Sequence, residues 1–496
     1  MSPSALPPLP VIETQPLPID AAAVLPADAA AAYAVLLAPD ADWGGAIAQA
    51  WPGAPAELAA LIDAYGAPAA GKTTTIPLVG GPVARLILAA PAGEDGNAAR
   101  SAAAAAARAA GKASILLLQA PEPYAAAVVE GVVLAGPTVH LGPRTREPDD
   151  TRRALGRLIL LGAPDPGQVR LGTECARAAQ TARALANTPS NVKNPPWLAN
   201  QARAIGRAAG LRVTVWDEKA LARDGFGGIL AVGSGSVHEA RLVMLEHRPG
   251  AATEPPIVLV GKGITFDTGG LNVKPAAGML MMKTDMSGSA IVLGVMAGLK
   301  ALGVRRRVIG LLPLAENAMG AASYRPGDVV THYGGTTAEI GNTDAEGRIV
   351  LADALAYAAA ELDPAALVDI ATLTGHARIA LASAMAPSYG TDDALHTRIR
   401  DAFAAAGEPL WPMPLVEDYR SSLESDVADL SHIGPIGGQG AGSILAALFL
   451  REFTGGRPWV HLDIAGTGRS ESDTGFLAKG ATGYGTRGLL RWLVEE

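Results

Sequence analysis

Two carboxylates and a guanidinium occupy alternate positions in one short segment of the chain. Residues 342–348 read Asn-Thr-Asp-Ala-Glu-Gly-Arg and carry Asp344, Glu346 and Arg348. In an extended or irregular loop the side chains at i, i+2 and i+4 point the same way, so these three would face one site. Neighbouring carboxylates raise each other's pKa unless a cation lies between them, and Arg348 or a metal ion would supply that charge. The alternative is an acidic helix start, because the helix dipole also favours Asp and Glu there.

A second group of charged residues lies upstream in an apolar, Gly-rich stretch. It contains Lys262, Asp267, Lys274 and Asp285, and it follows the apolar run 257–260, which predicts a buried strand. Lys and Asp are rare in such surroundings unless they are paired or bind a metal. The two stretches together offer four carboxylates, whose charge two divalent cations would balance. Oxygen ligands suit zinc, manganese or magnesium, and a pair of metals roughly 3.5–4 Å apart serves aminopeptidases and phosphatases.

These stretches resemble the motifs of the leucyl aminopeptidases, the M17 family of cytosol aminopeptidases. The matching segments run in order from about Asn187 to the C-terminus. They are Gly-Lys-Gly-Ile-Thr-Phe-Asp-Thr-Gly-Gly at 261–270, Leu-Pro-Leu-Ala-Glu-Asn at 312–317, Arg-Pro-Gly-Asp at 325–328, the segment 342–348, Ala-Thr-Leu-Thr-Gly at 371–375 and His-Leu-Asp-Ile-Ala-Gly at 461–466. The first 165 or so residues carry no matching motif, as is usual for the variable N-terminal domain of this family.

The resemblance implies a role for each charged residue. The metal ligands would be Lys262, Asp267, Asp285, Asp344 and Glu346, with Asp267 and Glu346 bridging two divalent ions (zinc or manganese, with magnesium and cobalt also admitted). Lys274 would stabilise the oxyanion of the tetrahedral intermediate, and Arg348 would hold a bicarbonate ion that shuttles the proton. A lysine binds metal only as the neutral amine, so the pKa of Lys262 would have to fall well below its usual value of about 10.4. From the residues alone, an ion pair with an aspartate is the alternative for Lys262.

The activity implied is the release of N-terminal residues, preferably leucine and other apolar residues, from peptides by attack of a metal-bridging hydroxide. The side-chain pocket would be lined by Met282, Asn342, Thr372, Leu373, Gly375 and Ala465. A Met in an apolar stretch is more often plain core, which is the alternative for Met282. The sequence departs from the family pattern at Ser287 and Ser289, which are candidate helix N-caps, and at Thr467-Gly468, where the family often has a larger apolar residue.

Other functions on the same scaffold remain open. One is a dipeptidase of narrow specificity, such as a Cys-Gly hydrolase, and another is a DNA-binding regulator. The net charge of −8 gives no general attraction to nucleic acid, so we do not expect it as a partner. None of the eight histidines falls in a His-Glu-x-x-His pattern, and no Gly-x-Ser-x-Gly or phosphate-loop motif occurs. Family members assemble as hexamers, so the resemblance also implies a homohexamer.

The elements that position these residues predict an α/β protein. We expect a smaller N-terminal α/β domain over residues 1–165, a linking helix over 166–186 and a catalytic domain over 187–496, whose mostly parallel central sheet is flanked by helices. The site would lie at the carboxyl ends of the strands. Residues 1–20 are Pro-rich and predict an extended lead-in, and the polar segment 143–150 predicts a boundary.

Individual elements follow from the apolar patterns. Expected strands are 76–79 (at a sheet edge because of Pro77), 83–89, 114–119, 132–135, 159–162, 212–216, 242–247, 257–260, 307–313 and 366–371, and expected helices are 98–110, 124–134, 168–186, 287–302 and 347–362. The helix and the strand that overlap at 132–134 are alternatives.

The composition predicts a cytoplasmic protein. The only cysteine is Cys175, so no intrachain disulfide can form and nothing argues for secretion. No Lys or Arg precedes Lys72, so the basic region of a signal peptide is lacking. No apolar run of membrane-spanning length occurs, so no membrane contact is expected.

Overall fold

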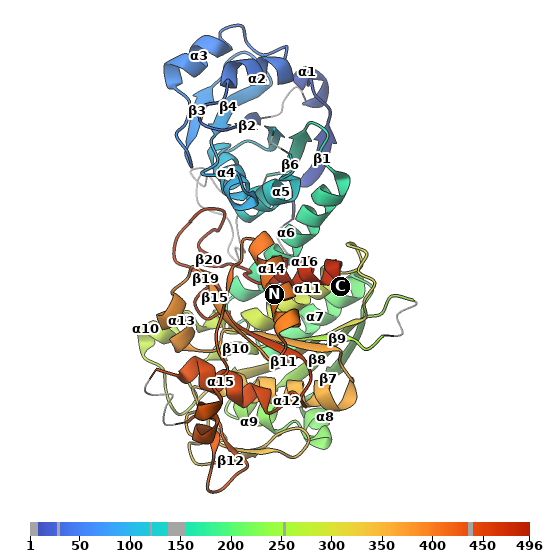
Figure 1. The fold of residues 1–496 in the computed structure, drawn as a ribbon, viewed down its shortest axis with the longest axis vertical. Coiled ribbons are helices and arrows are strands. Elements are labelled where there is room, and N and C mark those ends of the chain that lie inside the picture. The colour runs from blue at the N-terminus through green and yellow to red at the C-terminus, as the bar shows by residue number, and fades with distance from the viewer. Residues whose placement is uncertain (1–7, 27–29, 120–121, 137–154, 251–253, 435–439) are drawn as a thin grey trace. The chain divides into compact units, whose positions relative to one another are not determined.

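The computed structural model describes residues 8–26, 30–119, 122–136, 155–250, 254–434 and 440–496. The chain divides into two compact units (Figure 1), one over residues 1–180 with 471–479 and the other over 181–470 with 480–496. The division falls inside the helix α6 (Pro166–Asn187), which contains the expected linking helix. The expected boundary segment 143–150 lies outside the described residues.

The first unit is built on a six-stranded sheet in the order β1-β6-β5-β2-β4-β3, parallel except for β3. Alternate residues of a strand point to opposite faces, so Tyr33 and Val35 enter one core while Ala32 and Ala34 enter the other. Its strands are β1 (Val11–Gln15), β2 (Ala31–Leu36), β3 (Thr73–Pro77), β4 (Val83–Ala89), β5 (Ile115–Gln119) and β6 (Arg157–Leu161). Its helices are α1 (Ala21–Val24), α2 (Trp43–Ala50), α3 (Leu58–Tyr65), α4 (Gly96–Ala109), α5 (Ala125–Leu134) and the first part of α6.

One strand prediction for this unit is wrong, and one is confirmed. Within the expected extended lead-in, residues 11–15 are extended, and as β1 they also pair with β6. Residues 132–135 form no strand, since 132–134 belong to α5. Helix α5 packs closely on α4, and a Cβ at Gly131 would lie 2.1 Å from the Arg100 carbonyl oxygen, so packing overrides the strand preference of its valines. Pro77 does lie in an edge strand, as expected.

The second unit is built on a nine-stranded sheet in the order β16-β15-β18-β14-β9-β11-β8-β7, with β10 also paired to β11. The central strands β18, β14, β9 and β11 are parallel, which confirms the expected α/β class. The strands are β7 (Arg212–Trp216), β8 (Arg241–His247), β9 (Ile257–Gly261), β10 (Gly263–Asp267), β11 (Val308–Asn317), β14 (Ala366–Ala371), β15 (Ala386–Gly390), β16 (Leu410–Pro412) and β18 (Trp459–Asp463). Smaller sheets contain β12 (Val329–Thr331), β13 (Thr337–Glu339) and β17 (Leu430–Ser431), and β19 (Arg469–Ser470) with β20 (Gly480–Ala481).

Helices cover both faces of this sheet. Figure 1 shows α7, α11 and α16 on one side and α9, α12 and α15 on the other. Ile309 and Leu311 of β11 share a core with Ile349 of α12, whereas a Cβ at Gly310 would lie 2.9 Å from Met296 of α11. The helices are α7 (Pro195–Ala208), α8 (Glu218–Asp224), α9 (Gly227–Gly233), α10 (Ala276–Met279), α11 (Ser287–Gly298), α12 (Glu346–Glu361), α13 (Gly375–Leu381), α14 (Asp393–Ala405), α15 (Gly442–Arg451) and α16 (Thr486–Glu495), with 3-10 turns η1 (Met282–Thr284) and η2 (Glu417–Leu423). Within the described part of the chain, no helix combines the length and the apolar character that a membrane span requires.

The chain changes its neighbouring strands at Lys262, which lies between β9 and β10. β9 and β10 pair with β11 in one continuous register, in which Val260 lies beside Leu311 and Gly263 beside Leu314. β14 pairs with β9 only as far as Gly261, where it leaves the strand. Lys262 therefore lies at the point where the sheet opens between β10 and β14.

Candidate metal centre

The predicted site gathers at the carboxyl ends of neighbouring strands in the second unit. Asp267 ends β10 and Asn317 ends β11, and the two residues are partners in the strand register. Thr372 follows β14 directly, and Asp463 ends β18. Open parallel sheets place their binding sites at this edge, so the candidate residues lie where a site is expected.

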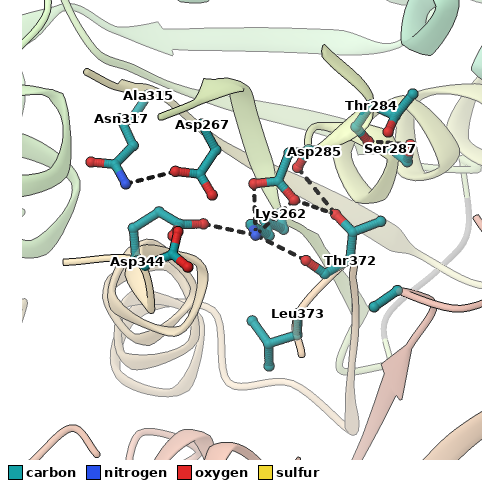
Figure 2. A network of polar contacts seen from close by, with 12 residues as sticks. Lys262, Asp267, Thr284, Asp285, Ser287, Ala315, Asn317, Asp344, Thr372 and Leu373 are labelled. Atoms are coloured by element: carbon teal, nitrogen blue, oxygen red, sulfur yellow. Dashed lines mark hydrogen bonds and ion pairs between the residues drawn. The ribbon is translucent and has the colours of Figure 1, made fainter. Parts of the chain in front are cut away.

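A buried ion-pair group surrounds Lys262. Its Nζ lies 2.8 Å from Asp285 Oδ2 and 2.8 Å from Glu346 Oε1. It also donates a hydrogen bond of 2.9 Å to the Thr372 carbonyl oxygen, and Thr372 Oγ1 donates to Asp285 Oδ1 at 2.7 Å (Figure 2). Because the Lys262 side chain is only 3% exposed, these contacts stabilise its positive charge in place of water.

A second ion-pair group surrounds Lys274. Its Nζ lies 2.8 Å from Asp267 Oδ2 and also contacts Asp344 Oδ1. The other oxygen of Asp267 accepts hydrogen bonds of 2.8 Å from the Gly269 amide and 2.8 Å from Asn317 Nδ2. Both oxygens of Asp267 are thus held, which fixes the direction in which this carboxylate points.

Three carboxylates converge between the two groups. Single carboxylate oxygens of Asp267, Asp344 and Glu346 all lie within 4.8 Å of one another. Burial and the charge of Glu346 raise the pKa of Asp267 to about 6, and burial raises the pKa of Asp344. Glu346 Oε2 is buried and has no hydrogen-bond partner, which leaves an unsatisfied acceptor on one of the three carboxylates.

This donor set fits divalent metal ions. Four carboxylates are matched by only two ammonium groups, and a buried carboxylate oxygen without a partner costs free energy. All of the oxygens are hard ligands of the kind that zinc, manganese and magnesium accept. The five predicted ligands are brought together, and their role as ligands stays a prediction.

Lys262 is an ion-paired ammonium in this arrangement. Burial lowers its pKa, but the charges of Asp285, Glu346 and Asp267 outweigh burial, and the net pKa is raised. The lowered pKa that metal ligation needs would therefore have to come from divalent cations, because the surrounding carboxylates act in the opposite direction.

Arg348 is not positioned by an extended loop, as the alternate spacing assumed. The chain becomes helical at Glu346, so the extended geometry assumed for residues 344–348 is wrong. Arg348 lies in the first turn of α12, and its Nη1 donates a hydrogen bond of 2.7 Å to the His432 carbonyl oxygen. Burial lowers the pKa of Arg348 to about 10, which still leaves it charged at neutral pH. The alternative of an acidic helix start also holds, since Glu346 begins the helix.

The predicted pocket residues lie around the same strand ends. The Leu373 and Ala465 amides donate to one oxygen of Asp463, each at 3.1 Å. Asn342 lies in the loop before Asp344, and its Oδ1 accepts the Asp344 amide at 2.9 Å. Met282 lies in η1, while Gly375 begins α13 and is exposed. Their role in binding a substrate side chain stays a prediction.

Comparison with known proteins places the chain in a family. The model of the cytosol aminopeptidase family, catalytic domain, matches residues 180–490, which is more than half of the chain. The chain belongs to the cytosol aminopeptidase family. This membership confirms the resemblance found from the motifs.

Three relatives of this family member illustrate the similarity. A probable cytosol aminopeptidase of Desulfovibrio desulfuricans is 50% identical over 323 residues, covering 65% of this chain and 64% of that protein, slightly less than two thirds of its length. One of Roseiflexus castenholzii is 42% identical, covering 77% and 78% of the two chains. The solved structure of the bottromycin maturation enzyme BotP in complex with Mn has a TM-score of 0.81 and 33% identity, and it covers 94% of this chain and 99% of BotP.

Sequence reasoning missed three residues that support the candidate site of this family member. Asn317 is fully buried and holds both Asp267 Oδ1 and the Thr343 carbonyl oxygen. Asp463 accepts from four donors in the loops that follow β14 and β18. His432 lies beside the loop that carries Asp344. The first two fall within matched motifs, which was the available signal, and no local pattern marks His432.

The two serines that depart from the family pattern are not helix caps. Met286 is the N-cap of α11, and it makes no side-chain cap hydrogen bond. Ser287 Oγ donates to the Thr284 carbonyl oxygen at 2.5 Å, and Ser289 Oγ donates to the Gly261 carbonyl oxygen at 2.6 Å. The N-cap prediction is therefore wrong, because both hydroxyls bond carbonyl groups instead of free helix amides.

Proposed function

We propose that the protein is a metal-dependent aminopeptidase that releases N-terminal residues, preferably leucine and other apolar residues, from peptides. The observation that carries this is the convergence of Asp267, Asp344 and Glu346 within 4.8 Å in a member of the cytosol aminopeptidase family. Divalent ions bound there would polarise the scissile carbonyl and activate a water molecule. The Mn in the BotP structure supports manganese as one suitable ion, and zinc also accepts carboxylate ligands.

The five ligands divide into two sets around a shared centre. Asp267 and Glu346 would bridge two ions, Lys262 and Asp285 would complete one site, and Asp344 would complete the other. The existing contacts support this division, because Lys262 is bound to Asp285 and Glu346, whereas Asp344 lies with Asp267 on the far side of the cluster. Asn317 would keep Asp267 oriented whether or not an ion is bound.

Lys274 and Arg348 supply positive charge to the reaction. The Lys274 side chain is 16% exposed, compared with 3% for Lys262, so Lys274 is the ammonium that can reach a substrate. We assign it the stabilisation of the oxyanion. Arg348 stays charged and has no proton to give at neutral pH, and its buried Nε makes no hydrogen bond. It would hold an anion such as bicarbonate that moves the proton.

The specificity, assembly and location follow from the family. Met282, Leu373 and Ala465 would give the pocket an apolar lining, which separates side chains by only about 1–3 kcal/mol per methylene, so several apolar residues should be accepted. The relatives are named cytosol aminopeptidases, which supports a cytosolic location. A homohexamer is the expected assembly, and sedimentation velocity of the purified protein would test it.

The decisive experiment measures hydrolysis of leucine p-nitroanilide by protein as purified, stripped with chelator, and reloaded with manganese or zinc. The test variant is Glu346→Gln. Its matched control is Glu246→Gln, which removes a buried carboxylate that is paired with Arg307 at 2.7 Å. Glu246 is the strand partner of Ile309, near the end of β11 opposite to Asn317, so it lies away from the candidate site. We expect stripping to abolish turnover, metal to restore it, and Glu346→Gln to lose more than about 100-fold, since even outer-shell changes cost about 10–100-fold.

Three results would contradict the proposal in different ways. Full activity after stripping would exclude a metal-dependent reaction. Equal losses in the Glu346 and Glu246 variants would show that buried charge in general, and not the cluster, is responsible. Metal bound without turnover of leucine p-nitroanilide would refute the apolar preference, and a dipeptide panel that includes Cys-Gly would then identify the substrate.

A further inference from the structure

His432 is a buried histidine whose contacts reach two parts of the site. Its Nε2 lies 3.0 Å from the Asn342 carbonyl oxygen, and the Gly341 amide nitrogen lies 3.0 Å from its Nδ1. Its own backbone carbonyl accepts the 2.7 Å hydrogen bond from Arg348 Nη1. One residue thus holds both the loop that leads to Asp344 and the guanidinium of Arg348.

The contacts assign the tautomer of the ring. The Gly341 amide can only donate, so Nδ1 is the acceptor and Nε2 carries the proton that is donated to Asn342. The Glu339 carbonyl oxygen, 3.1 Å from Nδ1, accepts instead from the His432 amide at 3.1 Å. The opposite tautomer would set the lone pair of Nε2 against the Asn342 carbonyl oxygen.

Few contacts separate the His432 ring from Asp344, and the residues between them are tightly packed. Asn342 Oδ1 accepts a hydrogen bond of 2.9 Å from the Asp344 amide, so the orientation of Asn342 determines the position of the Asp344 backbone. Gly341 packs directly against the residue that follows His432, because a Cβ there would lie 2.7 Å from Ile433 Cγ1. A change in the ring therefore moves the loop instead of being absorbed by a gap.

We propose that His432 is a positioning residue that fixes the 341–344 loop through its ring and Arg348 through its carbonyl group, so that Asp344 and Arg348 are held in one relative geometry. The effect on Mn²⁺ affinity rests on the proposed metal site alone, whereas the effect on turnover rests on the proposed activity as well. The ring contacts can be separated by substitution, because the amide nitrogen of Gln can replace Nε2 and the amide oxygen of Asn can replace Nδ1.

The test compares His432→Gln, His432→Asn and His432→Ala with wild type. The matched control is His247→Gln, a buried histidine whose Nε2 lies 2.9 Å from the Val304 carbonyl oxygen. Mn²⁺ affinity is measured by titration calorimetry on stripped protein without substrate, and kcat and KM are measured on loaded protein. We expect His432→Ala to lose about 10-fold in affinity at one of two Mn²⁺ sites and about 10-fold in kcat, with KM nearly unchanged.

The amide variants decide between positioning and general support of the fold. Gln keeps the donor to Asn342 next to Asp344, so we expect it to recover most of the Mn²⁺ affinity, with Asn between Gln and Ala. Equal losses in all three variants, a loss of the same size in His247→Gln, or wild-type Mn²⁺ affinity in His432→Ala would each overturn the inference. If wild type itself binds Mn²⁺ without hydrolysing peptides, the proposed function fails, while the ranking of Mn²⁺ affinities still tests His432.

Discussion

Gly347→Ala separates the stability of α12 from the geometry of the site. A Cβ at Gly347 would lie 2.6 Å from Cε and 2.8 Å from Nζ of Lys262, closer than any ordinary contact. The obstructing atoms are the far end of a flexible side chain, so the backbone need not move and Lys262 shifts instead. Alanine is also the better helix former, by up to about 1 kcal/mol relative to glycine.

The expected magnitude follows from the contacts that the shift breaks. Lys262 Nζ donates a hydrogen bond of 2.9 Å to Asp285 Oδ1 and lies 2.8 Å from Glu346 Oε1, and hydrogen bonds to charged groups contribute about 1.5–3 kcal/mol each. Misplacement of a catalytic group by about 1 Å costs on the order of 100-fold in rate, which corresponds to about 2.7 kcal/mol. The melting temperature should fall by a few degrees, because the gain in helix propensity of up to about 1 kcal/mol offsets only part of the lost pairing.

The measurement combines kcat/KM on leucine p-nitroanilide, Mn²⁺ affinity of the stripped protein and the thermal midpoint. Gly278→Ala in α10 is the control, because a Cβ there meets no atom within 4 Å, and this variant should match wild type in all three. If Gly347→Ala keeps wild-type kcat/KM and Mn²⁺ affinity, the position of Lys262 is not important and the reasoning is refuted. A collapse of the thermal midpoint would show that the backbone, and not Lys262, takes up the clash.

Two further changes test the surroundings of the site. Asp463→Asn keeps one acceptor for the Leu373 amide but places an amide group against the Thr374 donors. We therefore expect urea titration to show a loss of about 2–4 kcal/mol in unfolding free energy. We also expect KM to change more than kcat, and a wild-type KM would contradict this. His461 is fully buried, and burial lowers its pKa, but the charge of Asp369 at 2.6 Å outweighs burial and the net pKa is raised. The ion pair between His461 and Asp369 therefore contributes fully to stability below about pH 6.5, and this contribution is lost as pH rises through the folded-state pKa of His461. The urea midpoint of wild type should therefore fall more between about pH 6 and pH 9 than that of His461→Gln, and parallel curves would refute this.

The charged residues of the site could be predicted because each one is unusual where it stands. Lys262 and Asp267 interrupt an apolar, Gly-rich stretch, and a buried charge needs a partner wherever the chain folds. Asp344 and Glu346 belong to a short motif that the family shares. Sequence alone therefore found all five candidate ligands, of which Asp267 ends a strand and Glu346 begins a helix.

The neutral members of the site could not be found in the same way. His432 contacts Asn342 across 90 positions of the chain, and nothing in its neighbourhood predicts that contact. Asn317 ends a matched motif, but its contact with Asp267 depends on the strand register, which the motif does not show. The backbone at Arg348 was misjudged for a related reason, because the motif does not show that the helix begins at Glu346.

The same limit explains the errors in the first unit. Valines favour strands, yet 132–134 are helical because α5 lies against α4, and that approach depends on Gly131 having no side chain. β1 follows a proline-rich start whose composition predicts no pairing, and it becomes a strand only because β6 offers a free edge. Local preference is a weak guide wherever the partner is distant in sequence.

The position of Asp285 depends on the backbone more than on side chains. A Cβ at Gly288 would lie 2.1 Å from the Ile370 carbonyl oxygen, and a Cβ at Gly261 would lie 2.4 Å from the Gly288 carbonyl oxygen. The N-terminus of α11 thus meets β9 and β14 in direct backbone contact, at the place where the two strands part. This contact brings Asp285, two residues before the helix, to Lys262. No side chain fits at Gly288, whereas Ser289 is accommodated because its hydroxyl donates to the Gly261 carbonyl group.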